Sequence, residues 1–156
     1  MQNTDITTDL EILKITRQNA LNLIKDFTYD QLIKIPVGFN NSLLWNFTHM
    51  VITQQILVYK FSGGTPLVDD ELISLFKKGS EGSNNISPQA FNAICAIALP
   101  LVDQTANDYK ELSSNTYNTY TTSYNITLDS ASKAINFNNS HEALHLGVMM
   151  QIKKFI

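Results

Sequence analysis

All three histidines of this 156-residue chain are candidates for metal binding. His141 and His145 enclose the sequence His-Glu-Ala-Leu-His, and residues four apart on a helix lie one turn apart on the same face. Two neutral imidazoles in that position can share one metal ion, whereas two buried imidazolium rings would repel each other. The pair therefore favours a metal site over a purely structural role. The same five residues are the signature of zinc peptidases, in which the glutamate is the general base.

The residues that follow His145 argue against a peptidase. Residues 146–156 contain no Asp, Glu or His, so the downstream ligand of the glutamate-type zinc peptidases is missing. The longer signature with a third histidine fails as well, because Val148 and Gln151 stand where it requires glycine and histidine. The third ligand must then come from upstream. Glu142 lies about 100° around the helix from His141, and we expect it to be a solvated surface residue.

His49 is the candidate for the third ligand. It is in line with Trp45, Ile52 and Ile56 on one face of a predicted helix. A single histidine on such an apolar stripe is more often a core residue held by one hydrogen bond. Together with the other pair it would form a three-imidazole set between facing helices, as helical bundles use for metals. Such a set leaves coordination positions open for water or substrate, which is typical of catalytic sites.

Four long amphipathic segments are predicted to carry these residues. They cover residues 8–27, 42–61, 87–112 and 129 to the C-terminal region, with a short helical piece at 69–77. An irregular connector is expected at 29–39, and a long polar loop with some extended structure at 113–127. The pattern predicts an all-α fold, a four-helix bundle with a long loop before the last helix, as a single domain over residues 1–156.

Several local signals fix the ends and faces of these segments. Thr8 opens a capping-box sequence, Asn41 or Ser42 can cap the second helix, and Ser87-Pro88 is a typical helix start. Thr127 or Asp129 is expected to cap the last helix. Pro100 should bend the third helix, and Arg17 is expected to pack its aliphatic stem along the first. The predicted inward face of the last helix consists of Phe137, His141, Leu144, His145, Val148, Ile152 and Phe155.

Composition narrows the possible partners and location. The net charge is −3, and Lys77-Lys78 and Lys153-Lys154 are isolated pairs, so we expect no nucleic-acid or membrane binding. No apolar run approaches the ~18 residues of a membrane span, and the N-terminus shows no signal-peptide pattern. A single cysteine, Cys95, agrees with a cytoplasmic location. Its apolar neighbours favour a buried, inert thiol over a nucleophile.

Two stretches of the sequence carry a family resemblance. Residues 41–49, followed by Gln54-Gln55 and Tyr59-Lys60, resemble the second helix of DinB-like (DinB/YfiT-like) proteins. Residues 141–147 resemble the closing H-x-x-x-H-x-G signature of that superfamily, and the likeness extends from the first helix to the last. The resemblance implies a four-helix bundle in which His49, His141 and His145 hold a divalent ion such as Zn, Ni, Fe or Mn. It agrees with the site that the spacing indicates. One departure is that Val148-Met149-Met150 follow Gly147, where relatives often have glutamine.

The predicted site leaves two classes of function open. The first is a metal-dependent enzyme acting on a small molecule, in which the ion activates a water, as in a hydrolase, or a low-molecular-weight thiol, as in an S-transferase. The resemblance implies the second case, because some relatives are transferases or isomerases that use bacillithiol, mycothiol or glutathione. Trp45, Asn46, Thr53 and Asn138 are then expected, from their helical adjacency to the histidines, to shape the pocket or to support the ligands. The alternative is a non-enzymatic metal-binding, ligand-binding or stress-associated protein, or one whose histidines have become structural. The resemblance also implies a homodimer.

Overall fold

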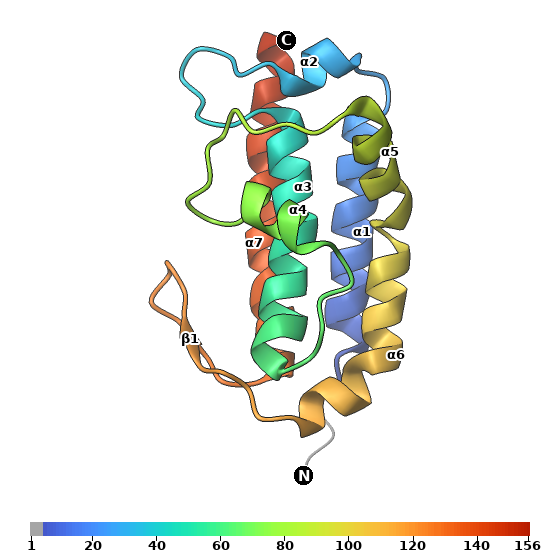
Figure 1. Cartoon of the computed structure of the whole chain (residues 1–156), viewed down its shortest axis with the longest axis vertical. Helices are drawn as coiled ribbons and strands as arrows, with labels where there is room; N and C mark the ends of the chain where they lie inside the picture. The colour runs from blue at the N-terminus through green and yellow to red at the C-terminus, as the bar shows by residue number, and fades with distance from the viewer. Residues whose placement is uncertain (1–4) are drawn as a thin grey trace.

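The computed structural model describes residues 5–156, which are mostly α-helical. The long helices are α1 (Thr7–Ile24), α3 (Leu43–Gln54), α6 (Pro100–Ser114) and α7 (Ala131–Ile152). The shorter ones are α2 (Tyr29–Ile33), α4 (Asp70–Phe76) and α5 (Pro88–Ile97). Within the described part of the chain, β1 (Tyr120–Thr121) and β2 (Thr127–Leu128) form the one sheet, an antiparallel hairpin. The expected all-α class is confirmed, and Figure 1 shows the long helices side by side.

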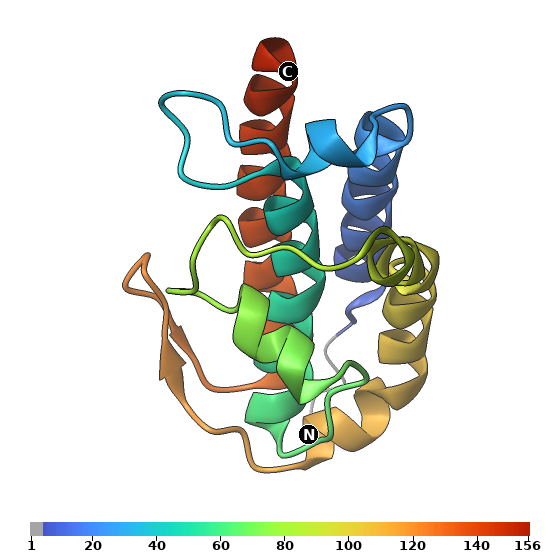
Figure 2. The ribbon, with the colours of Figure 1, turned by 45° about the horizontal axis from the view of Figure 1, so that its top comes forward.

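Helix α7 is the central element, because it packs against α3 on one side and against α1 on another. Helix α6 in turn contacts both α1 and α7. Figure 2 shows α4 lying across α3 and the hairpin standing beside them. A helix that packs against two neighbours buries two different faces, which matters below for Glu142. No helix among residues 5–156 combines the length and the apolar run that crossing a bilayer requires.

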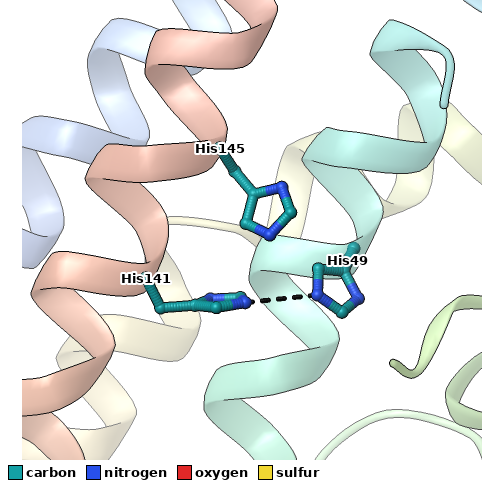
Figure 3. Close-up of side chains that lie close together, drawn as sticks. All are labelled: His49, His141 and His145. Atoms are coloured by element: carbon teal, nitrogen blue, oxygen red, sulfur yellow. Dashed lines mark hydrogen bonds between the residues drawn. The ribbon is translucent and has the colours of Figure 1, made fainter. Parts of the chain in front are cut away.

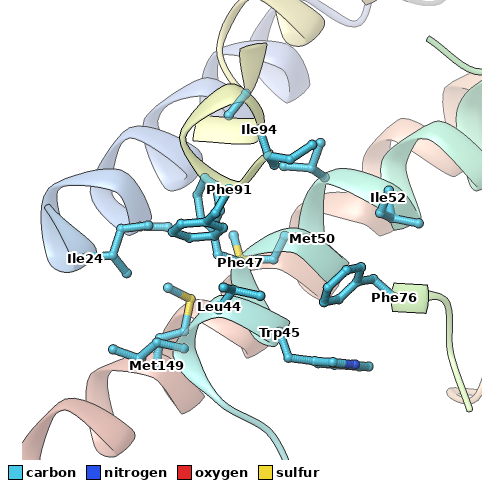
Figure 4. Packing of buried hydrophobic residues seen from close by; sticks show 14 of the residues in the cluster. Ile24, Leu44, Trp45, Phe47, Met50, Ile52, Phe76, Phe91, Ile94 and Met149 are labelled. Carbon is cyan, nitrogen blue, oxygen red and sulfur yellow. The ribbon is translucent and has the colours of Figure 1, made fainter. Parts of the chain in front are cut away.

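The buried side chains form two clusters along the helices. The first gathers around Phe47, Met50 and Phe91, and Phe47 meets Phe91 edge to face at 6.0 Å between ring centroids (Figure 4). Fully burying one such side chain contributes about 1.5–3 kcal/mol. Phe76, the last residue of α4, is completely buried in the same cluster. Its burial fixes the end of α4 against α3, close to His49.

Two of the predicted helix starts are confirmed. The Ser42 hydroxyl accepts a hydrogen bond from the Trp45 amide at 3.0 Å, and the Ser87 hydroxyl accepts one from the Ala90 amide at 3.1 Å. Each side chain satisfies an amide that the first turn of a helix leaves free. These caps place the N-termini of α3 and α5 where the sequence predicts them.

Other helix ends differ from the prediction. Helix α1 begins at Thr7 with Ile6 as N-cap and no side-chain cap, so the capping box at Thr8 is wrong. Helix α2 has a capping box instead, formed by Thr28 and Gln31, and it lies within residues 29–39, for which the sequence predicts an irregular connector. Ser130, rather than Thr127 or Asp129, caps α7. The sequence predicts no signal peptide at the N-terminus. Residues 1–4, on which this prediction mainly rests, lie outside the described residues.

The third predicted helix is divided at Pro100 into α5 and α6. Proline has no amide hydrogen and its ring clashes with the preceding turn, so the helical hydrogen bonds are interrupted here. Ala98 and Leu99 keep helical dihedral angles, which is consistent with the predicted bend. The amides of Val102 and Asp103 both bond to the Leu99 carbonyl, at 2.9 and 3.3 Å. The buried Ala98 carbonyl accepts instead from Arg17 Nη1, at 2.8 Å. The break therefore supplies an acceptor for a guanidinium from α1.

The second predicted helix extends as expected but changes its geometry. After α3 the chain continues as a π-helix (Gln55–Tyr59) and a 3₁₀-helix (Lys60–Ser62). Gly63 ends the segment with φ 70°, a left-handed conformation that favours glycine. Gln54 and Gln55 are fully buried at this change of geometry, and Gln54 Nε2 donates to Thr105 Oγ1 of α6 at 2.7 Å.

Candidate metal site

The three histidines meet between α3 and α7, as the sequence predicts (Figure 3). One ring nitrogen of each lies within 4.8 Å of the corresponding atoms of the other two. The Nε2 atoms of His49 and His141 are 3.2 Å apart. His49 is 4% exposed and the other two rings are half-buried. His49 precedes His141 by 92 positions and His145 by 96. The packing of α3 against α7 thus brings together imidazoles that are far apart in the chain.

A backbone carbonyl fixes the orientation of His49. The Phe76 carbonyl, at the end of α4, lies 2.5 Å from His49 Nδ1. A carbonyl can only accept, so Nδ1 carries the hydrogen and donates it. Nε2 then holds the free lone pair, and it points toward the other histidines. Trp45 stacks on the other side of the imidazole, with ring centroids 4.5 Å apart and planes 16° apart.

An asparagine fixes the orientation of His145 in the same way. Asn46 Nδ2 donates to the Ser42 carbonyl at 2.8 Å, which sets the rotation of the amide. Its Oδ1 therefore faces His145 and accepts from Nδ1 at 2.8 Å. His145 Nε2 is left with the lone pair. Hydrogen bonds of this kind, made by the outer nitrogen of a histidine, are typical of metal ligands.

His141 is held differently. Its Nδ1 is buried and has no hydrogen-bond partner among the described residues. Its Nε2 faces His49 Nε2, which already has its lone pair toward the cluster. Leaving a buried polar nitrogen unpaired costs about 1–3 kcal/mol. This cost falls on Nδ1 whether or not the ring binds a metal through Nε2, so it does not decide between the two roles. The case for a cation rests on His49 and His145, whose outer hydrogen bonds turn two lone pairs toward the cluster. The residues fit a divalent metal ion.

Burial keeps the three rings neutral. Desolvation, followed by the neighbouring imidazoles, lowers the pKa of His141 to about 2. Desolvation and then His49 lower the pKa of His145 to about 4. Burial also lowers the pKa of His49, and the bond to Phe76 opposes it. At neutral pH each ring therefore keeps the lone pair that a metal ion requires.

These lowered pKa values predict how the stability of the metal-free protein depends on pH. The unfolded chain binds protons at histidine below pH 6.5, whereas folded His141 and His145 do not until about pH 2 and 4. The stabilisation is thus complete above pH 6.5 and is lost progressively as the pH falls, toward pH 4 for His145 and toward pH 2 for His141. Urea unfolding across this range measures it. The double variant His141→Gln/His145→Gln should show a shallower dependence, and an unchanged slope would contradict the assignment.

A pocket of about 500 Å³ opens onto the histidines. Its wall comes from α3 and its π-helical extension, from α7, from the β1–β2 hairpin and from the loop after α4. Trp45 and Thr53 line it, as predicted, and Thr53 Oγ1 lies 3.3 Å from His49 Nε2. Asn46 and Asn138 do not line it, because both are buried, Asn46 against His145 and Asn138 against Glu142. Sequence reasoning missed the contributions of the hairpin and the loop.

The expectation that Glu142 is a solvated surface residue is wrong. Its side chain is completely buried where α7 faces α1, and it forms a bidentate ion pair with Arg17. Arg17 Nε lies 3.3 Å from Oε2, Nη2 contacts Oε1, and Asn138 Nδ2 donates to Oε1 at 3.0 Å. Because Glu142 lies about 100° around the helix from His141, its carboxylate points into the contact between α7 and α1 and not into the contact between α7 and α3. Glu142 does not line the pocket, so it cannot act there as a general base.

Arg17 is buried over its whole length, not only along its stem. Besides the two bonds to Glu142 it donates to the Ala98 carbonyl at the break between α5 and α6. One guanidinium therefore joins α1, α7 and the α5–α6 break directly behind the histidines. Arg17 stands on an otherwise apolar stripe of α1, and this position indicates a buried partner of opposite charge.

The predicted inward face of the last helix is also partly wrong. Leu144 is 50% exposed and Phe155 is 60% exposed. Leu144 lies at the pocket, and Phe155 stands in a terminal 3₁₀ turn, 5.7 Å from the ring of Phe39. The buried residues include Asn138, Glu142 and Met149 instead. A single stripe does not describe α7 because it packs against two helices.

Cys95 does not belong to the site. It is half-buried against the first core cluster and does not line the pocket. Burial raises the pKa of its thiol to about 11, so the thiol is protonated at neutral pH. The prediction of an inert thiol is consistent with this environment.

The comparison with known families finds one match over most of the chain. The sequence model of the DinB superfamily matches residues 12–149, a span that includes all three histidines, Arg17 and Glu142. No curated protein matches the chain at a significant level.

Proposed function

The chain belongs to the DinB superfamily, and from that membership and the histidine cluster we propose that it is a metal-dependent enzyme acting on a small molecule. His49, His141 and His145 would hold one divalent ion. The observation that carries the proposal is the pair of outer hydrogen bonds, from His49 to Phe76 and from His145 to Asn46, that turns two lone pairs inward. Neutral imidazoles suit Zn, Ni, Fe and Cu. The arrangement of α1, α3, α6 and α7 supports the four-helix bundle implied by the resemblance.

When bound, such an ion lowers the pKa of a coordinated thiol or water and orients it. Other residues of the chain form the pocket around the bound ion and its ligand. Thr53 places its hydroxyl at the pocket side of His49, where it can bond to a group beside the cluster. Ile56, Leu57 and Phe137 line the pocket with apolar surface, which excludes water from around the reacting atoms.

The surroundings of the cluster favour an S-transferase over a hydrolase. No Asp or Glu is found among the described residues that line the pocket, and Glu142 is already paired with Arg17. Hydrolysis by an activated water is usually assisted by a general base, whereas a thiolate attacks without one. The protonated Cys95 lies elsewhere. The nucleophile would therefore be a low-molecular-weight thiol that enters with the substrate.

The direct assay uses metal-loaded protein, a panel of bacillithiol, mycothiol and glutathione, and small electrophiles. We expect thiol consumption that disappears in His141→Ala. Full metal loading without turnover of any thiol or ester substrate would favour the alternative, a non-enzymatic metal-binding or ligand-binding protein. The observation that favours this alternative is that the described residues lining the pocket include no carboxylate.

We expect Asn46→Ala to lower the affinity for a divalent metal by about 10–100-fold, the usual effect of removing the partner of a metal-bound histidine. Asn46 Oδ1 holds His145 Nδ1, and its loss frees His145 to rotate. A competition titration against a coloured chelator measures the change. Asn136→Ala is the matched control, because this exposed asparagine of α7 bonds only to Asp9, at 2.9 Å. Equal affinities of the two variants would contradict the role of Asn46.

The homodimer implied by the resemblance stays a prediction. Sedimentation of the purified 17.5 kDa chain tests it directly, with twice that mass as the expected result. A mass equal to that of one chain at all concentrations would contradict it.

A further inference from the structure

The pocket over the histidines combines an apolar wall with two lysines, and we propose that its ligand is an amphiphilic anion. Such a molecule has an apolar or aromatic body and carries a carboxylate or a similar anionic group. This inference rests on the proposed function in one respect only, that the substrate occupies this pocket. It names the chemical class of that substrate.

The apolar wall is made largely of aromatic rings. Phe61 and Tyr120 line the pocket with their ring centroids 5.1 Å apart. Tyr124 and Phe137 also line it and meet edge to face at 5.6 Å. These two contacts join the hairpin to the 3₁₀-helix that follows the π-helix and to α7. Aromatic surface of this kind binds apolar bodies and offers few hydrogen bonds to a strongly polar one.

The positive charge comes from the loop after α4. Lys77 and Lys78 line the pocket, and Gly79, with φ 85°, turns the chain directly after them. Neither lysine forms an ion pair in the part of the chain that the structure describes. The described pocket-lining residues include no carboxylate either, although the whole chain has a net charge of −3.

This distribution of charge selects the sign of the ligand. An acidic chain that concentrates two unpaired ammonium groups and no carboxylate at one pocket creates a local positive potential there. Anions are attracted and cations are repelled. A neutral molecule would gain from the aromatic wall but not from the lysines. The wall and the lysines together therefore favour a ligand that is apolar at one end and anionic at the other.

The single tryptophan of the chain provides the measurement. Trp45 lines the pocket, so its fluorescence reports occupancy without a label. Three probes of matched shape, phenylbutyrate, phenylbutanol and phenylbutylamine, are titrated into the metal-loaded full-length protein. We expect phenylbutyrate to bind about fivefold to tenfold more tightly than the alcohol, and the amine to bind most weakly, because two ammonium groups each contribute a modest interaction.

A pair of double variants identifies the source of the preference. Lys77→Gln/Lys78→Gln should bind the carboxylate and the alcohol equally. Lys153→Gln/Lys154→Gln changes the net charge by the same amount at exposed residues that do not line the pocket, and it should keep the full preference. Circular dichroism confirms that both variants are folded.

The outcomes separate this inference from the proposed function. Equal binding of carboxylate and alcohol to the unaltered protein would overturn the inference. So would a preference that survives in Lys77→Gln/Lys78→Gln and vanishes when the metal is removed, because the carboxylate would then bind the ion and not the lysines. A lysine-dependent preference in a protein that takes up no metal would leave the inference intact and overturn the proposed function.

Discussion

Replacing His141 with alanine is expected to lower the affinity for a divalent metal ion by about two to three orders of magnitude. Zinc bound by four protein ligands has an apparent binding free energy of about 10–16 kcal/mol, so one ligand accounts for roughly 3–4 kcal/mol. The Nε2 atom of His141 lies 3.2 Å from His49 Nε2. Competition with a coloured chelator at neutral pH measures the loss.

Leu144→Ala is the control for this variant. Leu144 lies on the same helix and lines the same pocket but offers no ligand, and its side chain is 50% exposed. It should bind metal like the unaltered protein. If His141→Ala kept the affinity of Leu144→Ala, the ion would have to bind elsewhere or not at all.

Replacing Glu142 with alanine is expected to lower the free energy of unfolding by about 3–5 kcal/mol. The change leaves the Arg17 guanidinium charged, completely buried and without its carboxylate. Asn138 loses an acceptor as well. Urea unfolding of the metal-free variant measures the effect without any contribution from metal binding.

The chain contains a matched control for this prediction. Lys14 is also on α1 and pairs with Asp103 of α6 at 2.6 Å, but both side chains are largely exposed. Lys14→Ala should cost at most about 1 kcal/mol. The double variant Arg17→Met/Glu142→Leu should be more stable than either single change, because it removes both charges from the interior. A loss for Glu142→Ala no larger than that for Lys14→Ala would show that the buried pair contributes little.

The histidine cluster could be predicted because it depends on local periodicity. The i, i+4 spacing of His141 and His145 and the position of His49 on an apolar stripe place all three inside the protein whatever the loops do. The caps at Ser42 and Ser87 are equally local and are confirmed. The capping box of α2 was also readable, since Thr28 and Gln31 have the required spacing.

The burial of Glu142 could not be predicted from one helix. A stripe analysis assigns each helix one buried face, whereas α7 packs against both α1 and α3. The carboxylate pairs with an arginine 125 positions away. The other acceptor of that arginine is the Ala98 carbonyl, which is free to accept because Pro100 interrupts the helix. Such partners become visible only when the helices are packed together.

The residues of the pocket wall could not be predicted from the sequence, for a different reason. The β1–β2 hairpin and the loop after α4 have short, irregular patterns without a period that would place them in space. Tyr120, Tyr124 and the two lysines reach the pocket through the path of these connections. The histidines lie on helices and can be predicted from helical spacing. The residues of the hairpin and of the loop after α4, which we propose to select the ligand, cannot be predicted in that way.

A crystal structure of the zinc-loaded protein, with anomalous diffraction at the zinc edge, tests the central claim most directly. We predict one strong anomalous peak bonded to a ring nitrogen of His49, His141 and His145 at about 2.0–2.1 Å, the usual distance from zinc to imidazole. The outer bonds from His49 to Phe76 and from His145 to Asn46 should persist. Crystals grown with excess zinc that show no peak between the three rings would contradict the account.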